Sequence, residues 1–338
     1  MGVEIKSVLV IGAGMSGLSA AARLVEAGLS VTLLDKGWAP GGRMATRRIV
    51  LGNGQTLRVD HGAQFFTARS EPFKDAVAAW QAEGLVSPWC SGFPKTASSP
   101  APSGGHPRFV SPRGMNAIPA LLAKGLDLHQ KQVVTHVAHD GDAWIVTTDT
   151  QQTWSADALL ITSPVPQTLS LLDASDHPLP RAVREELEAI TYHCCLAVMA
   201  VLDGPSGLPD PGAIQFHAEP VDWIADARTK GTIKEGFAVT IHGAPLFSRE
   251  HFEGDRKIAG ALLLESCRTL LQSKVLDVSI HGWRFAAPVT QYPQRCLSLL
   301  GETAPLVLAG DAFGECRVEG AFLSGCAAAD AVLQLGRL

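Results

Sequence analysis

A short glycine-rich stretch near the N-terminus limits the fold more than any other part of the sequence. An apolar run, Val8–Ile11, leads into Gly12-Ala13-Gly14-Met15-Ser16-Gly17, and a helical pattern and a second apolar run follow. This is the G-x-G-x-x-G spacing of a βαβ dinucleotide-binding unit. Gly12 turns tightly out of the strand, Gly14 lets backbone N–H groups approach a pyrophosphate, and Gly17 lets helix and strand pack closely. The stretch therefore predicts a nucleotide-binding α/β domain.

Two later features indicate which nucleotide is bound. Asp35, followed by Lys36, stands about 20 residues beyond the glycines, where an acidic side chain accepts a hydrogen bond from a ribose hydroxyl. Gly41-Gly42-Arg43-Met44 then offers backbone donors and a guanidinium fork that suit phosphate oxygens. This second motif separates FAD binders from NAD binders, so we expect one FAD. The alternative is a glycine-bearing turn in an unrelated α/β fold.

Composition excludes several other classes of protein. The 338 residues suffice for two domains, and with 46% hydrophobic residues, 18% charged residues and a net charge of -5 the chain resembles an ordinary soluble protein. Such a charge predicts no general affinity for nucleic acid. The apolar N-terminal region is interrupted by Arg23 and Glu26, which favours a βαβ unit over a signal peptide or a membrane anchor.

The cysteines point to a reduced environment. The chain has 7 of them, an odd number, with no C-x-x-C pair and no zinc spacing. We therefore expect a cytoplasmic protein with no metal site and no disulfide-reductase chemistry. Cys194 and Cys195 are adjacent, and we expect them to face opposite sides of a strand. Cys316 is the only cysteine close in sequence to a segment expected to face the cofactor, which we expect to be bound non-covalently.

Longer motifs resemble a known family. Gly41-Gly42-Arg43-Met44-Ala45-Thr46-Arg47-Arg48, followed by Asp60-His61-Gly62-Ala63-Gln64-Phe65-Phe66-Thr67, resembles the renalase-type FAD-dependent oxidoreductases of the flavin amine oxidase superfamily. Further matching segments, which occur in order along the chain, are Pro112–Ala117, Ile161–Gln167, Trp283–Pro288, Gly310-Asp311 and Arg317–Gly325. The resemblance implies a Rossmann-like FAD-binding domain, a parallel sheet plus a β-meander. A second α+β substrate domain of the p-hydroxybenzoate hydroxylase/amine oxidase-like kind completes the expected α/β fold.

The two domains are expected to be discontinuous in sequence. We assign residues 1–70, 108–165 and 294–338 to the FAD-binding domain, and residues 71–107 and 166–293 to the substrate-binding domain. The second set contains no further glycine fingerprint. This favours a substrate-binding cap over a separate NADPH domain.

The resemblance also implies the cofactor contacts. The backbone at Val134 is expected to lie against the adenine, with a plain core valine as the alternative. Asp311 is expected to accept a hydrogen bond from a ribityl hydroxyl, and the helix N-terminus near Gly320 to face the flavin N1–C2=O edge, where its partial positive charge stabilises reduced flavin. Glu319 is interpreted as a first-turn acid at that helix. The complete predicted set is Gly12, Ala13, Gly14, Met15, Ser16, Gly17, Asp35, Lys36, Gly41, Gly42, Arg43, Met44, His61, Gly62, Ala63, Gln64, Val134, Gly310, Asp311, Val318, Glu319, Gly320 and Ala321.

The expected chemistry needs little from the protein's acids and bases. A flavin accepts a hydride at N5, so the protein must stack a donor carbon over the ring and exclude water. Gln64 either binds the substrate or flavin edge or caps backbone groups. An aromatic wall with cations suits a flat, phosphate-bearing substrate such as a dihydronicotinamide dinucleotide, while core tryptophans and solvated cations are the alternative. The predicted catalytic residues are Gln64, His242, Trp283 and Arg284, with weaker candidates in Trp223, Arg228 and Lys230.

By resemblance, the protein oxidises isomeric or misreduced dihydronicotinamides to NAD(P)+ and passes the electrons to O2, giving hydrogen peroxide. A flavin amine oxidase is the first alternative, although only Tyr192 and Tyr292 are available as tyrosines for an aromatic pair beside the flavin. A non-catalytic flavoprotein that binds a partner protein is the second. Anaerobic bleaching of the flavin by a dihydronicotinamide or an amine would separate these three.

Overall fold

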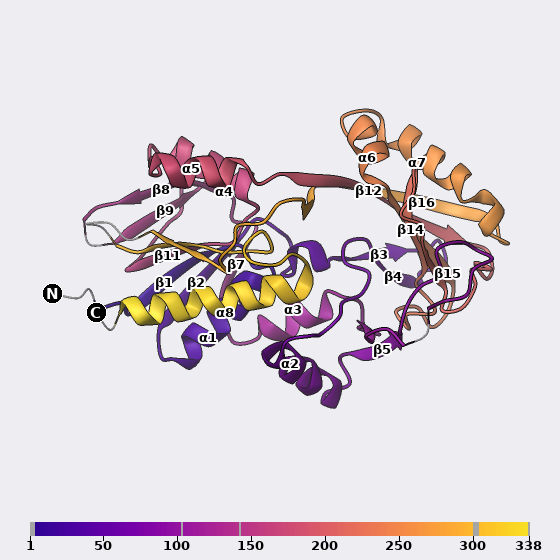
Figure 1. The fold of residues 1–338 in the computed structure, drawn as a ribbon, viewed down its shortest axis with the longest axis horizontal. Coiled ribbons are helices and arrows are strands. Elements are labelled where there is room, and N and C mark those ends of the chain that lie inside the picture. The colour runs from indigo at the N-terminus through magenta and orange to yellow at the C-terminus, as the bar shows by residue number, and fades with distance from the viewer. Residues whose placement is uncertain (1–3, 103, 142, 300–303, 337–338) are drawn as a thin grey trace. The chain divides into compact units, whose positions relative to one another are not determined.

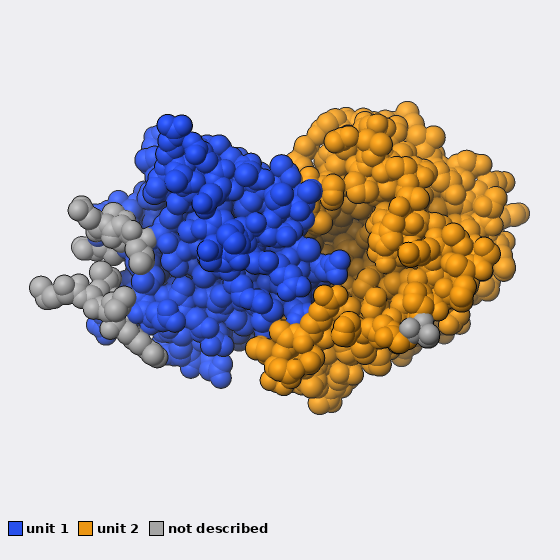
Figure 2. Space-filling model, in the orientation of Figure 1, with its two compact units in different colours: residues 1–42, 119–191, 288–338 blue, residues 43–118, 192–287 orange. Residues whose placement is uncertain are grey.

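The computed structural model describes residues 4–102, 104–141, 143–299 and 304–336, which form two compact units (Figures 1 and 2). Unit 1 comprises Met1–Gly42, Pro119–Thr191 and Pro288–Leu338, and unit 2 comprises Arg43–Ile118 and Tyr192–Ala287. Each unit is therefore assembled from stretches that are far apart in sequence.

A mostly parallel sheet forms the centre of unit 1. Its strands are β1 (Ser7–Ile11), β2 (Ser30–Asp35), β7 (Asp127–Gln130), β11 (Ala158–Ile161), β17 (Leu297–Leu299) and β18 (Leu306–Leu308). Their order is β17-β18-β11-β1-β2-β7, and all neighbours are parallel except β17 and β18. Since β1 lies between β11 and β2 and is buried on both faces, its apolar run is continuous.

Two helices lie side by side against this sheet, α1 (Met15–Glu26) and α8 (Arg317–Leu335) (Figure 1). They approach closely at Gly325, where an added Cβ would be 2.1 Å from the carbonyl oxygen of Ser16. By length and composition α8 could cross a membrane, but its apolar residues Ala328 and Val332 belong to the buried core of unit 1. Packing within the unit thus accounts for its hydrophobicity.

Unit 1 also contains the predicted β-meander. The antiparallel strands β8 (Val134–His139), β9 (Trp144–Thr148) and β10 (Thr153–Ala156) form it. Helix α4 (Val165–Ala174) is tied to β8 because the backbone N–H of Val137 donates to Ser175 Oγ, at 2.9 Å, just beyond the helix. Helix α5 (Arg181–Glu188) follows. The expected Rossmann-like domain with a parallel sheet and a meander is confirmed.

An antiparallel sheet forms the centre of unit 2. Its strands, in order across the sheet, are β13 (Ala213–Gln215), β14 (Val221–Asp226), β15 (Phe237–Gly243), β12 (Tyr192–Leu202) and β16 (Val275–Pro288). Helices α6 (Pro245–His251) and α7 (Arg256–Ser266) cover one face, which contributes Val198, Ile224 and Ile241 to the core beneath them. Cys194 packs against that core, so the next residue, Cys195, points to the other face, as strand alternation predicts.

The hairpin of β3 (Thr46–Val50) and β4 (Thr56–Asp60) packs on the opposite face of this sheet, and a 3-10 turn at Gly42–Met44 precedes it. Unit 2 also contains the pair β5 (Ser87–Cys90) and β6 (Arg108–Val110), helix α2 (Glu71–Ala82) and the 3-10 turn Arg268–Leu270 after α7. Helix α3 (Ala117–Leu122) begins in unit 2 and ends in unit 1. Leu57 and Val59 of the hairpin pack against Met199 and Val201 of β12. The hairpin is therefore part of the second core.

The units differ from the predicted domains in four stretches, one of which is residues 288–293, expected in the substrate domain but placed in unit 1. Residues 43–70 and 108–118, which we expected in the FAD-binding domain, lie in unit 2, because the β3–β4 hairpin shares its core with β12. Residues 166–191, expected in the substrate domain, lie in unit 1, because α4 packs beside β8. In both cases a segment belongs to the unit whose core it packs against, whatever its place in the sequence.

Candidate flavin and substrate site

The three glycines of the N-terminal motif are required for different structural reasons. Gly12 has φ +104°, which favours glycine, and a Cβ added at Gly17 would be 1.9 Å from the carbonyl oxygen of Gly12. The protein's own packing therefore requires both of these glycines. A Cβ at Gly14, in contrast, would meet no atom of the described residues within 4 Å. The space beside Gly14 is where a ligand can approach the backbone.

The first turn of α1 fits a pyrophosphate. Gly14 is its N-cap, no side chain in the described part of the chain caps it, and its first turn contains no acidic residue. Its backbone N–H groups are thus left for a ligand, and the partial positive charge of the helix end favours an anion. Together with the open position at Gly14, this arrangement matches the phosphate-binding role predicted from the sequence.

Asp35 holds the turn as well as offering acceptors. Its Oδ2 accepts a hydrogen bond from Ala13 N at 2.7 Å, and its Oδ1 accepts one from Gly37 N at 2.6 Å. A carboxylate has about four lone-pair positions, so it retains capacity for a ribose hydroxyl. Gly41 N donates to Ala13 O at 2.8 Å, which joins the second glycine motif to the first. The structure therefore brings together the predicted phosphate and ribose positions within unit 1, with Lys36 exposed beside them.

The last predicted cofactor segment lies at the same edge of the sheet. Gly12 follows the carboxyl end of β1 and Gly310-Asp311 follows that of β18, and the carboxyl ends of parallel strands are where α/β sheets bind ligands. Asp311 is buried, and Gly310 N donates to Ser324 Oγ at 2.8 Å. A Cβ at Gly320 would be 1.8 Å from the carbonyl oxygen of Glu315, so the first turn of α8 requires glycine there.

Three other predicted cofactor residues are placed less distinctively. Val134 begins β8, is half-buried, and pairs with Thr148 in the meander. Val318 and Glu319 are buried in the first turn of α8. These positions are compatible with the predicted roles, which remain predictions.

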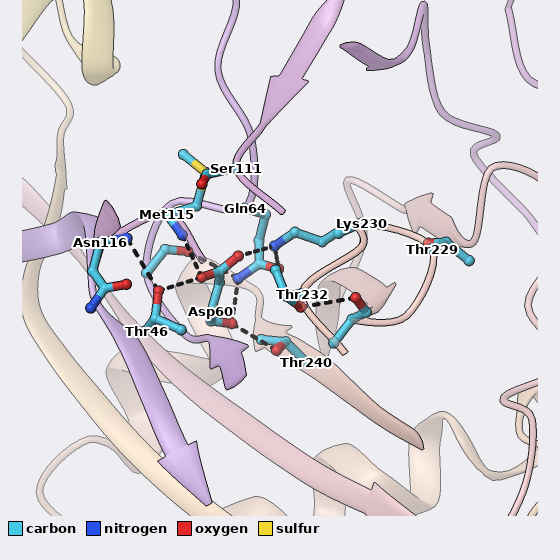
Figure 3. Close-up of polar contacts among 12 residues, drawn as sticks. Thr46, Asp60, Gln64, Ser111, Met115, Asn116, Thr229, Lys230, Thr232 and Thr240 are labelled. Carbon is cyan, nitrogen blue, oxygen red and sulfur yellow. Dashed lines mark hydrogen bonds and ion pairs between the residues drawn. The ribbon is translucent and has the colours of Figure 1, made fainter. Parts of the chain in front are cut away.

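A buried ionic network lies behind the Asp60–Gln64 motif in unit 2 (Figure 3). Lys230 Nζ and Asp60 Oδ2 are 2.6 Å apart, and the two side chains are only 2% and 0% exposed. Asp60 Oδ1 accepts hydrogen bonds from Thr46 Oγ1 at 2.6 Å and from Met115 N at 2.8 Å. Thr240 Oγ1 donates to Asp60 O at 2.8 Å. Asp60 therefore ties the β3–β4 hairpin, the segment before α3 and the central sheet to one point.

Gln64 belongs to this network. Its Nε2 donates to Asp60 O at 2.8 Å and to Gly62 O at 3.2 Å, and its Oε1 accepts from Lys230 Nζ at 3.2 Å. Of the two interpretations given by the sequence, these bonds match the backbone-capping one. Gly62 is needed in the same turn, since a Cβ there would be 1.9 Å from Arg43 O, to which Ala63 N donates at 2.8 Å. Gln64 thus shapes the turn that carries His61.

Arg43 is anchored to the edge strand of the same unit. Its Nη1 donates to Phe285 O at 3.2 Å and to Ala286 O at 3.4 Å, both on β16. Met44, next to it, is buried. These two hydrogen bonds fix the position of the Arg43 guanidinium group. The phosphate contact predicted for Arg43 remains a prediction.

Neutral aromatic rings gather on the face of the unit 2 sheet opposite α6 and α7. The rings of His61, His281 and Trp283 lie 4.3–5.4 Å apart, and Trp283 Nε1 donates to His61 O at 2.8 Å. Burial, assisted by His281 and Arg47, lowers the pKa of His61 to about 3. Burial, followed by the charge of Lys230, lowers the pKa of His242 to about 4. These rings are therefore uncharged near neutral pH and provide no strong base.

A second aromatic group surrounds Trp223 on the same face. Its ring centroid is 4.6 Å from that of Phe93 and 5.5 Å from that of Phe65. Buried nitrogens without a hydrogen-bond partner among the described residues are His61 Nδ1, Arg108 Nε, Trp223 Nε1 and His242 Nε2. The sequence analysis did not identify three residues of this face. His281 lies two positions before Trp283 on β16, so strand alternation could have indicated it. Phe65 and Phe93 could not be found in this way, because their contacts with Trp223 depend on the fold.

The predicted cations are not gathered on this face. Arg284 follows Trp283 on β16 and therefore points the other way, toward Phe252, and it pairs with Glu253 at 2.6 Å. Arg228 lies over the ring of Phe237, 4.9 Å from its centroid, and Lys230 is buried against Asp60. The structure thus separates Arg284 from Trp283, and the expectation that they form one wall does not fit it. In the described part of the chain, no group of three His, Cys, Asp or Glu side chains could hold a metal ion.

The fold and these motifs define a class of redox enzyme. The chain belongs to the flavin containing amine oxidoreductase family, whose model matches residues 95–333, and a model for an NAD(P)-binding Rossmann-like domain matches residues 10–80. It is a flavin-dependent oxidoreductase.

Among individual proteins, it is similar to the renalase of Mus musculus, with 25% identity over 333 residues, which cover 94% of this chain and 96% of that one. Two solved structures share the fold. A CLA-producing fatty acid isomerase from P. acnes has a TM-score of 0.69 and 12% identity over 99% of both chains. A mutant of putrescine oxidase has a TM-score of 0.65 and 14% identity over 97% of this chain and 98% of its own.

Proposed function

We propose that the protein is an FAD-dependent oxidase of dihydronicotinamides that converts isomeric or misreduced forms to NAD(P)+. The observation that carries the proposal is the neutral aromatic face of unit 2, built by His61, His281, Trp283 and Trp223. Similarity to renalase along nearly the whole chain supports it. When bound, the flavin supplies a hydride acceptor at N5 and passes electrons to O2, which gives hydrogen peroxide.

The residues of this face suit a donor that needs no deprotonation. A dihydropyridine already carries a weakly bound hydride, so stacking and exclusion of water suffice. His61 and His242 have lowered pKa values and remain neutral, and Lys230 is held by Asp60. The face therefore positions a flat ring and keeps water away, and it moves no proton.

FAD, rather than a shorter flavin, is favoured by the nucleotide motif. The open backbone at Gly14 suits a pyrophosphate, and Asp35 lies where an adenosine ribose would place its hydroxyls. A flavin mononucleotide has neither the second phosphate nor that ribose. Extraction of the purified protein with acid followed by chromatography should release one FAD per chain; colour left in the pellet would indicate a covalent link and make Cys316 the suspect.

An amine oxidase is the second candidate, because the matching family model describes amine oxidoreductases. The two tyrosines give it little support. Tyr192 lies 5.5 Å from Phe285 in unit 2, and Tyr292 lies 5.5 Å from Phe313 in unit 1, both measured between ring centroids. Each ring thus packs against a phenylalanine of its own unit.

Anaerobic rapid mixing tests the proposal. The flavin-loaded protein is mixed with β-NADH, with β-NADPH, with partially isomerised preparations of both, and with a panel of primary amines. We expect fast bleaching by components of the isomerised mixtures and, after air is admitted, one hydrogen peroxide per flavin reduced. Bleaching by an amine and by no dihydronicotinamide would replace this proposal with an amine oxidase. Bleaching by neither would favour the non-catalytic, partner-binding flavoprotein.

A further inference from the structure

Trp223 and His242 stand directly opposite each other on the neighbouring strands β14 and β15. Side chains at opposite positions of an antiparallel pair lie on the same face, with their Cβ atoms about 4.5–5.5 Å apart. Trp223 is 3% exposed, yet its Nε1 has no hydrogen-bond partner among the described residues, and the same is true of the buried Nε2 of His242. Buried polar atoms are nearly always paired, so two unpaired nitrogens on directly opposite residues need partners that the described residues do not supply.

The other tryptophans on this face behave differently. Trp89 Nε1 donates to Pro211 O at 3.1 Å, and Trp283 Nε1 donates to His61 O at 2.8 Å. Trp89 also touches Trp223, with ring centroids 6.3 Å apart. The unpaired N–H of Trp223 is thus particular to its position and is not a general property of the aromatic group.

The two nitrogens have opposite hydrogen-bonding characters. An indole N–H can only donate. The His242 ring is neutral, since burial lowers its pKa to about 4. A neutral imidazole carries one N–H and one lone pair, and the buried Nε2 of His242 has no hydrogen-bond partner among the described residues. With the proton on Nδ1, Nε2 presents a lone pair.

We propose that Trp223 and His242 bind the carboxamide group of the dihydronicotinamide ring. The indole N–H donates to the amide oxygen, and the amide N–H donates to Nε2 of His242. A primary carboxamide presents this acceptor and this donor on one planar group, so it satisfies both buried atoms at once. The inference rests on the proposed function and adds to it the means by which the substrate is recognised.

The surroundings strengthen such a contact. Phe65 and Phe93 pack on Trp223 and fix its ring, and they make the environment apolar, where hydrogen bonds are stronger than in water. An alkylamine, which is protonated near neutral pH, has no acceptor for the indole N–H and would leave that group buried and unpaired. Sites built to hydrogen-bond a substrate reject analogues that lack the matching group.

Comparison of carboxamide with acetyl ligands tests the proposal. NAD+ and its 3-acetylpyridine analogue both have the carbonyl oxygen, but the acetyl group has no N–H for His242. Dissociation constants are measured by titration against the flavin absorbance spectrum, and flavin reduction rates are measured with the dihydro forms. We expect the wild type to prefer the carboxamide about fivefold, the value of one ordinary hydrogen bond. His242→Leu should remove this preference, and His242→Gln should restore part of it, because a glutamine amide oxygen also accepts.

Trp223→Phe should weaken both ligands by a similar factor of about five and leave the preference unchanged, since both carry the carbonyl oxygen. Trp89→Phe is the matched control, because its N–H is already used by Pro211, and it should leave both dissociation constants at wild-type values. Far-ultraviolet circular dichroism and flavin content confirm that each variant is folded.

Retention of the wild-type preference in His242→Leu, or equal effects of Trp223→Phe and Trp89→Phe, would overturn the carboxamide assignment while the proposed function stands. Failure of every dihydronicotinamide to reduce the flavin, with no binding of either oxidised ligand, would overturn both. If His242→Leu does not fold, the ratio of the two dissociation constants in His242→Gln and the two tryptophan variants decides the matter.

Discussion

The two units hold their candidate ligands in different ways. In unit 1 the groups that would contact a nucleotide are mainly backbone N–H groups, exposed by Gly14 and organised by Asp35. In unit 2 they are side chains brought from distant segments, as in the pair of Lys230 and Asp60, which are 170 positions apart. A site made from backbone needs only a local turn, whereas a site made from side chains needs the whole unit folded. The two kinds of site should therefore respond differently to substitution.

The largest effect is expected at Lys230. Lys230→Met leaves Asp60 buried with its charge unpaired, which typically costs about 3–5 kcal/mol. Denaturant unfolding of the protein measures this loss. Arg284→Met is the matched control, because it breaks the exposed pair with Glu253 and should change stability little. Similar midpoints for the two variants would show that the buried pair does not organise unit 2.

Gly17 and Gly14 test the backbone site. Gly17→Ala places a Cβ against the carbonyl oxygen of Gly12 and should destabilise the protein by about 3 kcal/mol, as overpacking does. Gly14→Ala meets no described atom and should leave the stability of the flavin-free protein near that of the wild type, while it weakens flavin retention. Thermal unfolding with and without added flavin separates the two. A Gly14→Ala protein that keeps its full flavin content would remove Gly14 from the cofactor site.

The buried histidines of unit 2 predict that the stability of the protein falls at acid pH. The folded pKa values of His61 and His242 are lowered from 6.5 to about 3 and about 4, so the unfolded chain takes up protons first as the pH falls. Stability is therefore fully present above about pH 6.5 and falls from there to about pH 4 for His242 and to about pH 3 for His61, by up to about 1.4 kcal/mol per pH unit for each histidine. His242→Leu should flatten the slope, measured by denaturant unfolding at several pH values. His193→Leu, at an exposed position, should leave the slope unchanged. Equal slopes for the two variants would show that burial of His242 does not cause the acid sensitivity.

The smallest effect is expected from Arg284 on catalysis. Because this residue points away from Trp283 and pairs with Glu253, Arg284→Ala should change the KM for a dihydronicotinamide by less than about twofold, as expected for an exposed ion pair. This reverses the role that the sequence suggested for it. Steady-state kinetics would decide, and a large rise in KM with unchanged kcat would restore Arg284 to the substrate site.

The same contrast explains what the sequence could predict. The glycine motif and the apolar run before it, Val8–Ile11, are visible because periodicity and turn residues are local signals. The partner of Lys230 is not, because no local pattern links it to Asp60. The orientation of Arg284, in contrast, could have been predicted from the sequence. Adjacent residues on a strand point to opposite faces, so Arg284 cannot share the face of Trp283.

The contact of α8 with α1 at Gly325 also has a consequence for biosynthesis. The strand β1 and helix α1 are synthesised before any part of unit 2, but β18 and α8, which complete their core, are synthesised only after both stretches of unit 2. At about 5–20 residues per second, the apolar surface of α1 waits about 15–60 s for its partner. During this time the exposed apolar surface of the nascent chain must be protected from aggregation. We therefore expect chaperones to bind the N-terminal βαβ unit, although its motif is recognisable from local sequence alone.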